Sequence, residues 1–219
     1  MLSAKSLNRL AYLASTTRIE FLSIMTLTYP SHYPNDGKTV KGDLNRFLTA
    51  FKREYGKLSY LWFLEFQVRG APHFHILLSI KQPGAQGRYK MGTLWAKAMQ
   101  IDKWETDGLG LPSAEFIRHQ VVAVHTHPKS WENVRKPNGA RKYALKYATK
   151  PHQKQVPELY QNVGRFWGNS RDVPNDEVVF MSGSETQLRE FLDRLGRNLD
   201  HLDVLPKHIW TLDNWMPED

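Results

Sequence analysis

Two histidines separated by one residue, His73 and His75, are the most informative feature of this chain; residues 72–76 read PHFHI. If this stretch is a β-strand, its side chains alternate between two faces, so both imidazoles point to the same side about 7 Å apart. Two imidazoles and one oxygen ligand form a divalent-metal site with positions left open for substrate. The pair therefore predicts a metal site, provided that an oxygen donor lies beside it.

A second strand, predicted at residues 60–68, supplies that oxygen donor. Residues 69–72 (RGAP) form the turn of a hairpin that brings Glu65 or Gln67 beside the histidines. A hard cation such as Mg²⁺ or Mn²⁺ binds a carboxylate better than a neutral amide, so Glu65 is the preferred third ligand and Gln67 the alternative. A coincidental histidine pair beside a surface carboxylate would explain the same residues.

Two tyrosines provide a candidate nucleophile. Residues 141–150 (RKYALKYATK) are rich in helix formers and are followed by a proline. Residues four apart share a helix face, so Tyr143 and Tyr147 are neighbours, as are Lys146 and Lys150. A tyrosine hydroxyl is only about one-thousandth ionised at neutral pH. It attacks phosphorus effectively if a metal polarises the phosphate and lysines stabilise the charge. An ordinary amphipathic helix with a solvated basic face is the alternative.

The charge of the chain predicts a polyanionic partner. Its 30 Lys and Arg exceed its 22 Asp and Glu, for a formal net charge of +8, and phosphate neutralisation dominates nucleic-acid affinity. We expect Trp167, in the glycine-flanked segment 164–168, to stack on nucleic acid, with packing in the core as the alternative. The basic residues that we expect to contact nucleic acid surround the tyrosine helix: Arg135, Lys136, Arg141 and Lys142.

Composition excludes several other classes of protein. Without cysteine there is no disulfide, thiol nucleophile or thiolate-bound zinc. Residues 1–20 do not resemble a signal peptide, and no run approaches the roughly 20 apolar residues of a membrane span. We therefore expect a cytoplasmic protein with no membrane partner. A length of 219 residues predicts one domain, with a core at about 18–182 and a C-terminal helical extension at 183–219.

The order of predicted elements indicates an α+β fold with a central, mainly antiparallel sheet flanked by helices. Helices are expected at 4–15, 40–55, 90–102 and 184–200, and strands at 19–28, within 59–80 and at 119–126. A second histidine pair, His125 and His127, ends the last of these strands but lacks an acidic partner, so we reject it as a ligand pair. Residues 37–39 (GKT) lack the upstream glycine of a phosphate-binding loop, so no helicase motif is present.

Three of these segments together resemble the motifs of the HUH endonucleases, the rolling-circle replication initiators of plasmids and single-stranded DNA phages. Residues 21–30 are similar to the first motif, 70–78 to the second and 143–150 to the two-tyrosine form of the third; 164–168 resemble a segment that often follows.

This resemblance implies a five-stranded, ferredoxin-like or RRM-like HUH palm with Mg²⁺ or Mn²⁺ on His73, His75 and Glu65. It also implies site-specific nicking of single-stranded or hairpin origin DNA through a 5′-phosphotyrosine. The protein would be plasmid or phage encoded in a prokaryotic cell and would use a host helicase and polymerase.

Three other functions remain open at this point. A transposase or relaxase would use the same chemistry for another purpose. A basic DNA-binding module would carry these residues for structural reasons and would not cleave. An iron oxygenase would use two histidines and a carboxylate, but it leaves the tyrosine–lysine helix without a role.

Overall fold

The computed structural model of the chain describes residues 4–17, 19–103, 112–135, 139–149 and 156–173. All of these belong to one compact unit, Met1–Asn175. The helix predicted at 184–200 lies outside the described residues, as do Lys136 and Lys150. The single-domain organisation therefore stays a prediction.

A five-stranded sheet in the order β4-β1-β3-β2-β5 forms the centre of the fold, and every pairing in it is antiparallel. With helices packed around it, this confirms the predicted α+β fold. The strands are β1 (Ser23–Thr28), β2 (Tyr60–Phe66), β3 (Pro72–Leu78), β4 (Trp131–Asn133) and β5 (Trp167–Asn169).

The predicted hairpin is β2–β3. Its turn is closed by hydrogen bonds from the Gly70 amide to the Gln67 carbonyl (2.8 Å) and from the Gln67 amide to the Ala71 carbonyl (2.9 Å). Gly70 has φ +82°, a left-handed conformation that glycine adopts without a Cβ clash. The resulting register places Glu65 directly opposite His73.

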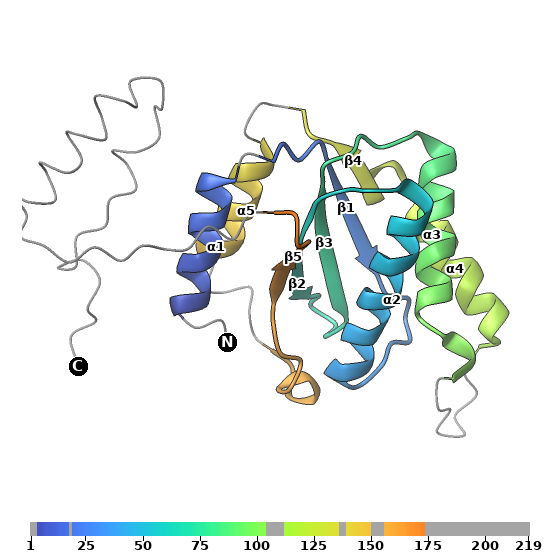
Figure 1. Cartoon of the computed structure of the whole chain (residues 1–219). Coiled ribbons are helices and arrows are strands. Elements are labelled where there is room, and N and C mark those ends of the chain that lie inside the picture. The colour runs from blue at the N-terminus through green and yellow to red at the C-terminus, as the bar shows by residue number, and fades with distance from the viewer. Residues whose placement is uncertain (1–3, 18, 104–111, 136–138, 150–155, 174–219) are drawn as a thin grey trace, which may run out of the picture. The chain divides into compact units, whose positions relative to one another are not determined.

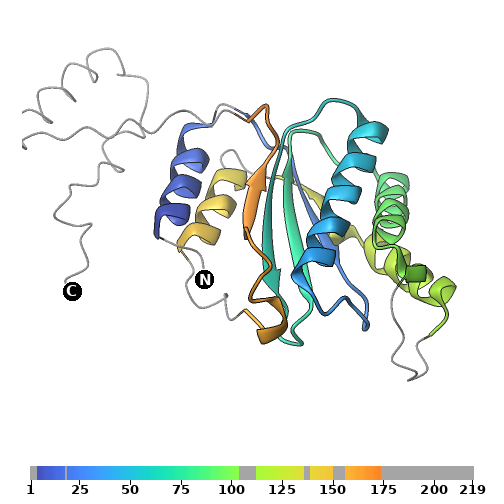
Figure 2. The ribbon, with the colours of Figure 1, turned by 60° about the horizontal axis from the view of Figure 1, so that its bottom comes forward.

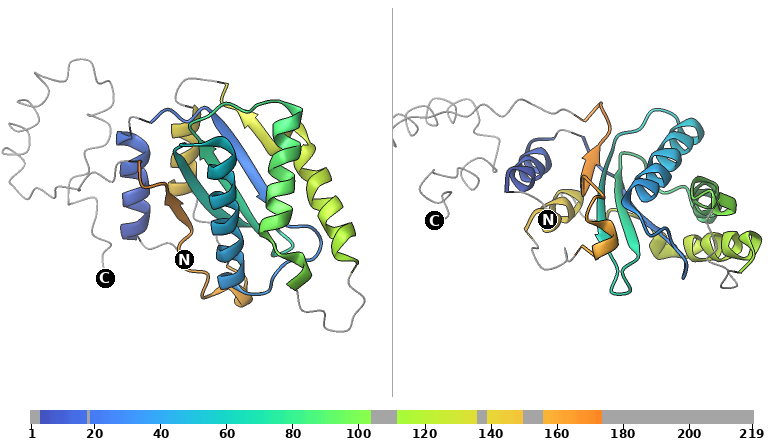
Figure 3. Two further views of the ribbon diagram at one scale, coloured as in Figure 1. Left: turned by 45° about the vertical axis from the view of Figure 1, so that its right-hand side comes forward. Right: turned by 90° about the horizontal axis from the view of Figure 1, so that it is seen from below.

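Helices cover both faces of the sheet, which gives three layers (Figures 1, 2 and 3). One face carries α2 (Gly37–Tyr55), α3 (Ala85–Ala98) and α4 (Ala114–Thr126), and the other carries α1 (Ala4–Thr16) and α5 (Gly139–Thr149). Short 3₁₀ helices complete the described elements: Ile101–Lys103, Pro128–Ser130 and Glu158–Tyr160. None of the described helices is long and apolar enough to cross a membrane.

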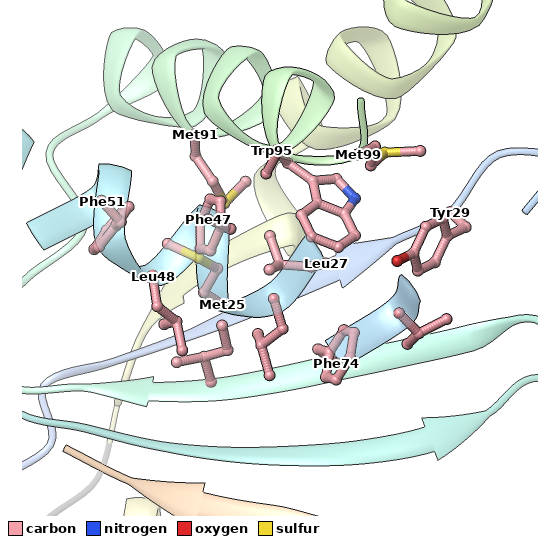
Figure 4. Packing of buried hydrophobic residues seen from close by; sticks show 14 of the residues in the cluster. Met25, Leu27, Tyr29, Phe47, Leu48, Phe51, Phe74, Met91, Trp95 and Met99 are labelled. Carbon is pink, nitrogen blue, oxygen red and sulfur yellow. The ribbon is translucent and has the colours of Figure 1, made fainter. Parts of the chain in front are cut away.

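The larger core lies beneath α2, α3 and α4 (Figure 4). Leu27 of β1 and Phe74 of β3 point into it, where they meet Phe47 and the ring of Trp95. The indole of Trp95 packs edge-on against Tyr29, with 5.1 Å between ring centroids. The same indole donates a hydrogen bond of 3.0 Å to the Thr28 carbonyl, so this core also fixes the end of β1.

A smaller core lies on the opposite face, under α1 and α5. Leu61 and Leu77 of the sheet contact Leu10 of α1, together with Ala140 and Ala144 of α5. The two alanines are one helical turn apart, and their small side chains allow α5 to approach α1 closely. This packing fixes the tyrosine helix against the sheet.

The strand predicted at 119–126 is wrong, because these residues belong to α4. The run of β-branched residues suggested a strand, but Ile117, Val121 and His125 are buried at intervals of four, the spacing of a helix. The Ser113 hydroxyl caps this helix by accepting a hydrogen bond from the Phe116 amide (3.2 Å). Tertiary burial here overrides local propensity. The sheet instead takes its outer strands from β4 and β5.

The Gly-Lys-Thr sequence at 37–39 forms the first turn of α2, three residues before the predicted start. The Asp36 carboxylate accepts a hydrogen bond of 2.9 Å from the Thr39 amide and so caps this helix. A Cβ on Gly37 would lie 2.4 Å from the Cα of Val163. The glycine is therefore explained by close packing.

Candidate active site

Two rows of polar residues cross the sheet on the face beneath α1 and α5. In antiparallel register, Thr28 lies opposite His73 and His73 opposite Glu65; Thr26 similarly lies opposite His75. Strand side chains alternate, so all five point to the same side. The hairpin thus places Glu65 beside both histidines, as the sequence predicted.

Tyr143, His75 and Glu65 form one connected chain of contacts. A hydrogen bond of 2.9 Å joins the Tyr143 hydroxyl to Nδ1 of His75. On the other side of the ring, Nε2 lies 3.3 Å from a carboxylate oxygen of Glu65. The side chains of His75 and Glu65 are only 15% and 18% exposed, so water screens the pair weakly. The tyrosine helix therefore faces the histidine strand.

His73 is held by the strands on either side of it. Its Nδ1 lies 2.9 Å from the Thr28 hydroxyl and 3.4 Å from Nε2 of Gln67. Burial, followed by the neighbouring His75 and His125, lowers the pKa of His73 to about 3. The ring is consequently neutral at physiological pH, which is the form that binds a metal.

Gln67 is oriented by Arg69 in the hairpin turn. The Arg69 Nε donates a hydrogen bond of 2.9 Å to the Gln67 side-chain oxygen, so the amide nitrogen faces His73. The oxygen is the only atom of this amide with a lone pair for a cation. Its engagement by Arg69 favours Glu65 over Gln67 as the oxygen ligand.

The end of β1 is fixed by a histidine of α4. The Thr28 amide donates a hydrogen bond of 3.1 Å to Nε2 of His125, while Nδ1 of His125 lies 2.6 Å from the Val121 carbonyl. Burial lowers the pKa of His125 to about 4, so this ring is also neutral. His125 thus supports Thr28, which in turn contacts His73.

The chemistry of the three donors fits a divalent cation, because neutral imidazole and carboxylate are ordinary ligands of such ions. Glu65 and His75 are already in contact, and the rings of His73 and His75 are 4.6 Å apart between centroids. Within the described part of the chain, however, no three His, Asp or Glu side chains are gathered as a group that could hold a metal ion. The three donors are adjacent without surrounding one point.

The predicted lysine and second tyrosine belong to the same helix. Lys146 is exposed, and its Nζ lies 5.9 Å from the ring centroid of Tyr143. Lys142 is exposed one residue before Tyr143. Tyr147 follows Tyr143 by one turn; its side chain and that of Arg141 lie outside the described residues.

Two predicted nucleic-acid contacts have protein partners. Arg135 is exposed and lies 3.6 Å from the Glu132 carboxylate. Trp167 packs against the smaller core, and its indole donates a hydrogen bond of 2.9 Å to the Ser6 hydroxyl of α1. This is the core packing that the sequence left as the alternative for Trp167. A role of either residue in DNA binding stays a prediction.

Sequence reasoning missed the residues that orient the histidines. The Thr-Leu-Thr alternation at 26–28 matches the His-Phe-His alternation at 73–75, and this pairing of patterns was the available signal. Arg69 and His125 carried no comparable signal, because their partners are determined by tertiary contacts.

An antiparallel five-stranded sheet whose paired histidines face a tyrosine helix is the arrangement expected of a Rep-type HUH protein. The model of the replication-associated protein ORF2 family matches residues 22–152, more than half of the chain, so the chain belongs to this family. The match confirms the recognition made from the three motifs and covers nearly all of their residues.

Other comparisons add little. No curated protein matches the chain. Among solved structures, the N-terminal nuclease domain of non-structural protein 1 from minute virus of mice is similar over 60% of this chain and 71% of that chain, at 9% identity and a TM-score of 0.33. A likeness this distant carries no conclusion about the site.

Proposed function

We propose that this protein initiates DNA replication by nicking single-stranded origin DNA, with Tyr143 or Tyr147 as the nucleophile. One observation carries the proposal: the Tyr143 hydroxyl lies 2.9 Å from Nδ1 of His75, whose other nitrogen faces Glu65. A nucleophile and its activating groups must lie within hydrogen-bond reach, and these three side chains do.

The cation site would consist of His73, His75 and Glu65, and Mg²⁺ or Mn²⁺ bound there would act as a Lewis acid on the scissile phosphate. When Nε2 of His75 serves as a ligand, the remaining ring proton lies on Nδ1. Nδ1 then donates to the phenolic oxygen of Tyr143, and a hydrogen bond to the charged form favours ionisation. His75 would thus both bind the cation and promote attack.

Tyrosine attack on phosphorus forms a phosphotyrosine ester and releases a 3′-hydroxyl, which a host polymerase can extend. Lys146, near Tyr143, and Lys150 would stabilise the negative charge that develops on the phosphate oxygens. The second tyrosine would perform the closing transfer. Membership in a replication-associated family favours replication over transposition or conjugation.

The decisive experiment traps the covalent intermediate on a random pool of single-stranded DNA, so that no recognised sequence has to be chosen beforehand. The pool, labelled in separate samples at the 5′ or the 3′ end, is incubated with the protein and Mn²⁺ and then resolved in SDS. We expect only the 3′ label to remain with the protein, because a 5′-phosphotyrosine retains the downstream fragment. Sequencing the trapped DNA then identifies the nick site.

Tyrosine variants test the nucleophile. The double substitution Tyr143→Phe with Tyr147→Phe should abolish the adduct, and His73→Ala should abolish cleavage that depends on metal. Tyr89→Phe is the matched control, because Tyr89 is 57% exposed on α3 in the opposite helix layer. An adduct that persists in the double variant would remove both tyrosines as nucleophiles.

A further inference from the structure

A cavity of about 570 Å³ opens at the edge of β1, beside the candidate active site. Thr26 and Thr28 form its wall on the sheet side, and Val124, His127 and Lys129 contribute from the end of α4 and the turn that follows. Ligand-binding pockets are commonly about 300–1,000 Å³, so the space is large enough for one nucleotide.

The cavity exists because β4 is short. β4 pairs with β1 only from Ser23 to Met25, so the rest of the β1 edge faces the end of α4. The hydrogen bond from the Thr28 amide to His125 fixes the distance between the strand and the helix. The space is therefore built by secondary structure on both sides.

The cavity and the candidate active site share two side chains. The hydroxyl of Thr28 lies 2.9 Å from Nδ1 of His73, and that of Thr26 lies 3.4 Å from Nδ1 of His75. Both threonines also line the cavity. A DNA strand whose phosphate reaches the histidines would thus have this cavity next to it.

The lining combines an apolar surface with positive charge. Val124 is 52% exposed although it is apolar, and Ala123 beside it is also exposed. Lys129 is exposed, and its backbone amide donates a hydrogen bond of 3.2 Å to Nδ1 of His127. Because Nδ1 accepts this bond, the His127 ring carries a proton on Nε2, where it serves as a donor. An apolar platform for a base, next to cations and donors for phosphate, is typical of single-stranded DNA binding.

We propose that this cavity binds the nucleotide next to the scissile phosphate, and this rests on the proposed nicking function. The base packs on Val124 and Ala123, and the phosphate contacts Lys129 and His127. The site would hold the strand in register with Tyr143.

Binding measurements on charge-matched variants test this site. The probe is a fluorescein-labelled single-stranded oligonucleotide of about 12 nucleotides, titrated by anisotropy in EDTA so that no nicking occurs. We expect Val124→Asp to weaken binding about 10-fold more than Val124→Asn, since the two side chains match in shape and differ in charge. Lys129→Glu should weaken binding about 10-fold more than Lys57→Glu, an exposed control at the other end of β2 from Glu65. Equal affinity within either pair would overturn the proposal.

Photo-crosslinking separates this proposal from the nuclease proposal. An oligonucleotide pool that contains 4-thiothymidine is irradiated with the full-length protein, and crosslinked peptides are identified by mass spectrometry. We expect crosslinks within residues 123–129, and these would form even if no tyrosine adduct does. Tyrosine adducts accompanied by crosslinks only to other segments would overturn the nucleotide site and leave the nuclease proposal intact.

Discussion

The two ends of the sheet face under α1 and α5 differ sharply in chemistry, although the same three strands form both. At one end, Ile24 lies opposite Leu77, and Leu77 opposite Leu61. Four residues further along β1, the corresponding row contains Thr28 and His73, together with Glu65 of β2. The apolar end holds the helices by burial, and the polar end presents groups that can bind and react.

Helix α5 spans both ends and connects them. Ala140 and Ala144 pack into the smaller core, while Tyr143 between them reaches His75 through a hydrogen bond. Because reactive groups must be held to within a fraction of an ångström, a helix anchored by packing is a suitable support. Rigidity at the apolar end therefore determines precision at the polar end.

The largest expected effect comes from making the polar end apolar. His75→Leu removes a proposed metal ligand and the hydrogen-bond partner of Tyr143, so we expect the adduct yield to fall at least about 10³-fold. Thermal unfolding should stay near that of the wild type, because leucine suits a face that continues into Leu77. Activity within 10-fold of the wild type would contradict the role of His75.

The reverse comparison concerns stability. Leu77 is fully buried in the smaller core, so Leu77→Ala should lower the free energy of unfolding by about 3 kcal/mol. Urea unfolding measures this loss. A change below about 1 kcal/mol would mean that the apolar end does not support the fold as its burial indicates.

Acid should weaken the fold through the buried histidines. Burial lowers the pKa of His125 to about 4, so the folded state keeps the ring neutral while the unfolded chain binds a proton below about pH 6.5. The stability contributed by His125 is therefore complete above pH 6.5. It is lost as the pH falls toward 4, by up to about 1.4 kcal/mol per pH unit.

Urea unfolding at pH 7 and pH 5 measures this slope. We expect His125→Gln to show a smaller difference between the two pH values than the wild type. His119→Gln should leave the difference unchanged, because the His119 side chain is 79% exposed. An identical slope in all three proteins would show that His125 does not titrate as its burial implies.

The smallest expected effect tests how the threonines orient the histidines. Thr28→Val is nearly isosteric and removes the hydroxyl that lies 2.9 Å from His73, so we expect about 10-fold weaker Mn²⁺ affinity by calorimetry. Thr26→Val should have a smaller effect, because its contact with His75 is 3.4 Å long. Equal affinities in both variants and the wild type would show that the threonines play no part in metal binding.

Much of the sheet was accessible from local patterns. Alternation and turn residues predicted the β2–β3 hairpin, and the hairpin register predicted that Glu65 lies beside the histidines. Helix α4 was misread, because its β-branched run mimics a strand and only the burial of Ile117, Val121 and His125 reveals the helical period.

The amino-acid sequence by itself determined which groups are available: paired imidazoles, a carboxylate opposite them, and tyrosines on a helix with lysines. These depend on spacing within single elements, where the period of a strand or helix decides which side chains share a face. Only the tertiary structure decided that Tyr143 meets His75, that Arg69 turns Gln67 away, and that His125 supports Thr28. Such contacts join residues distant in the chain, and packing of the whole core determines which of them form.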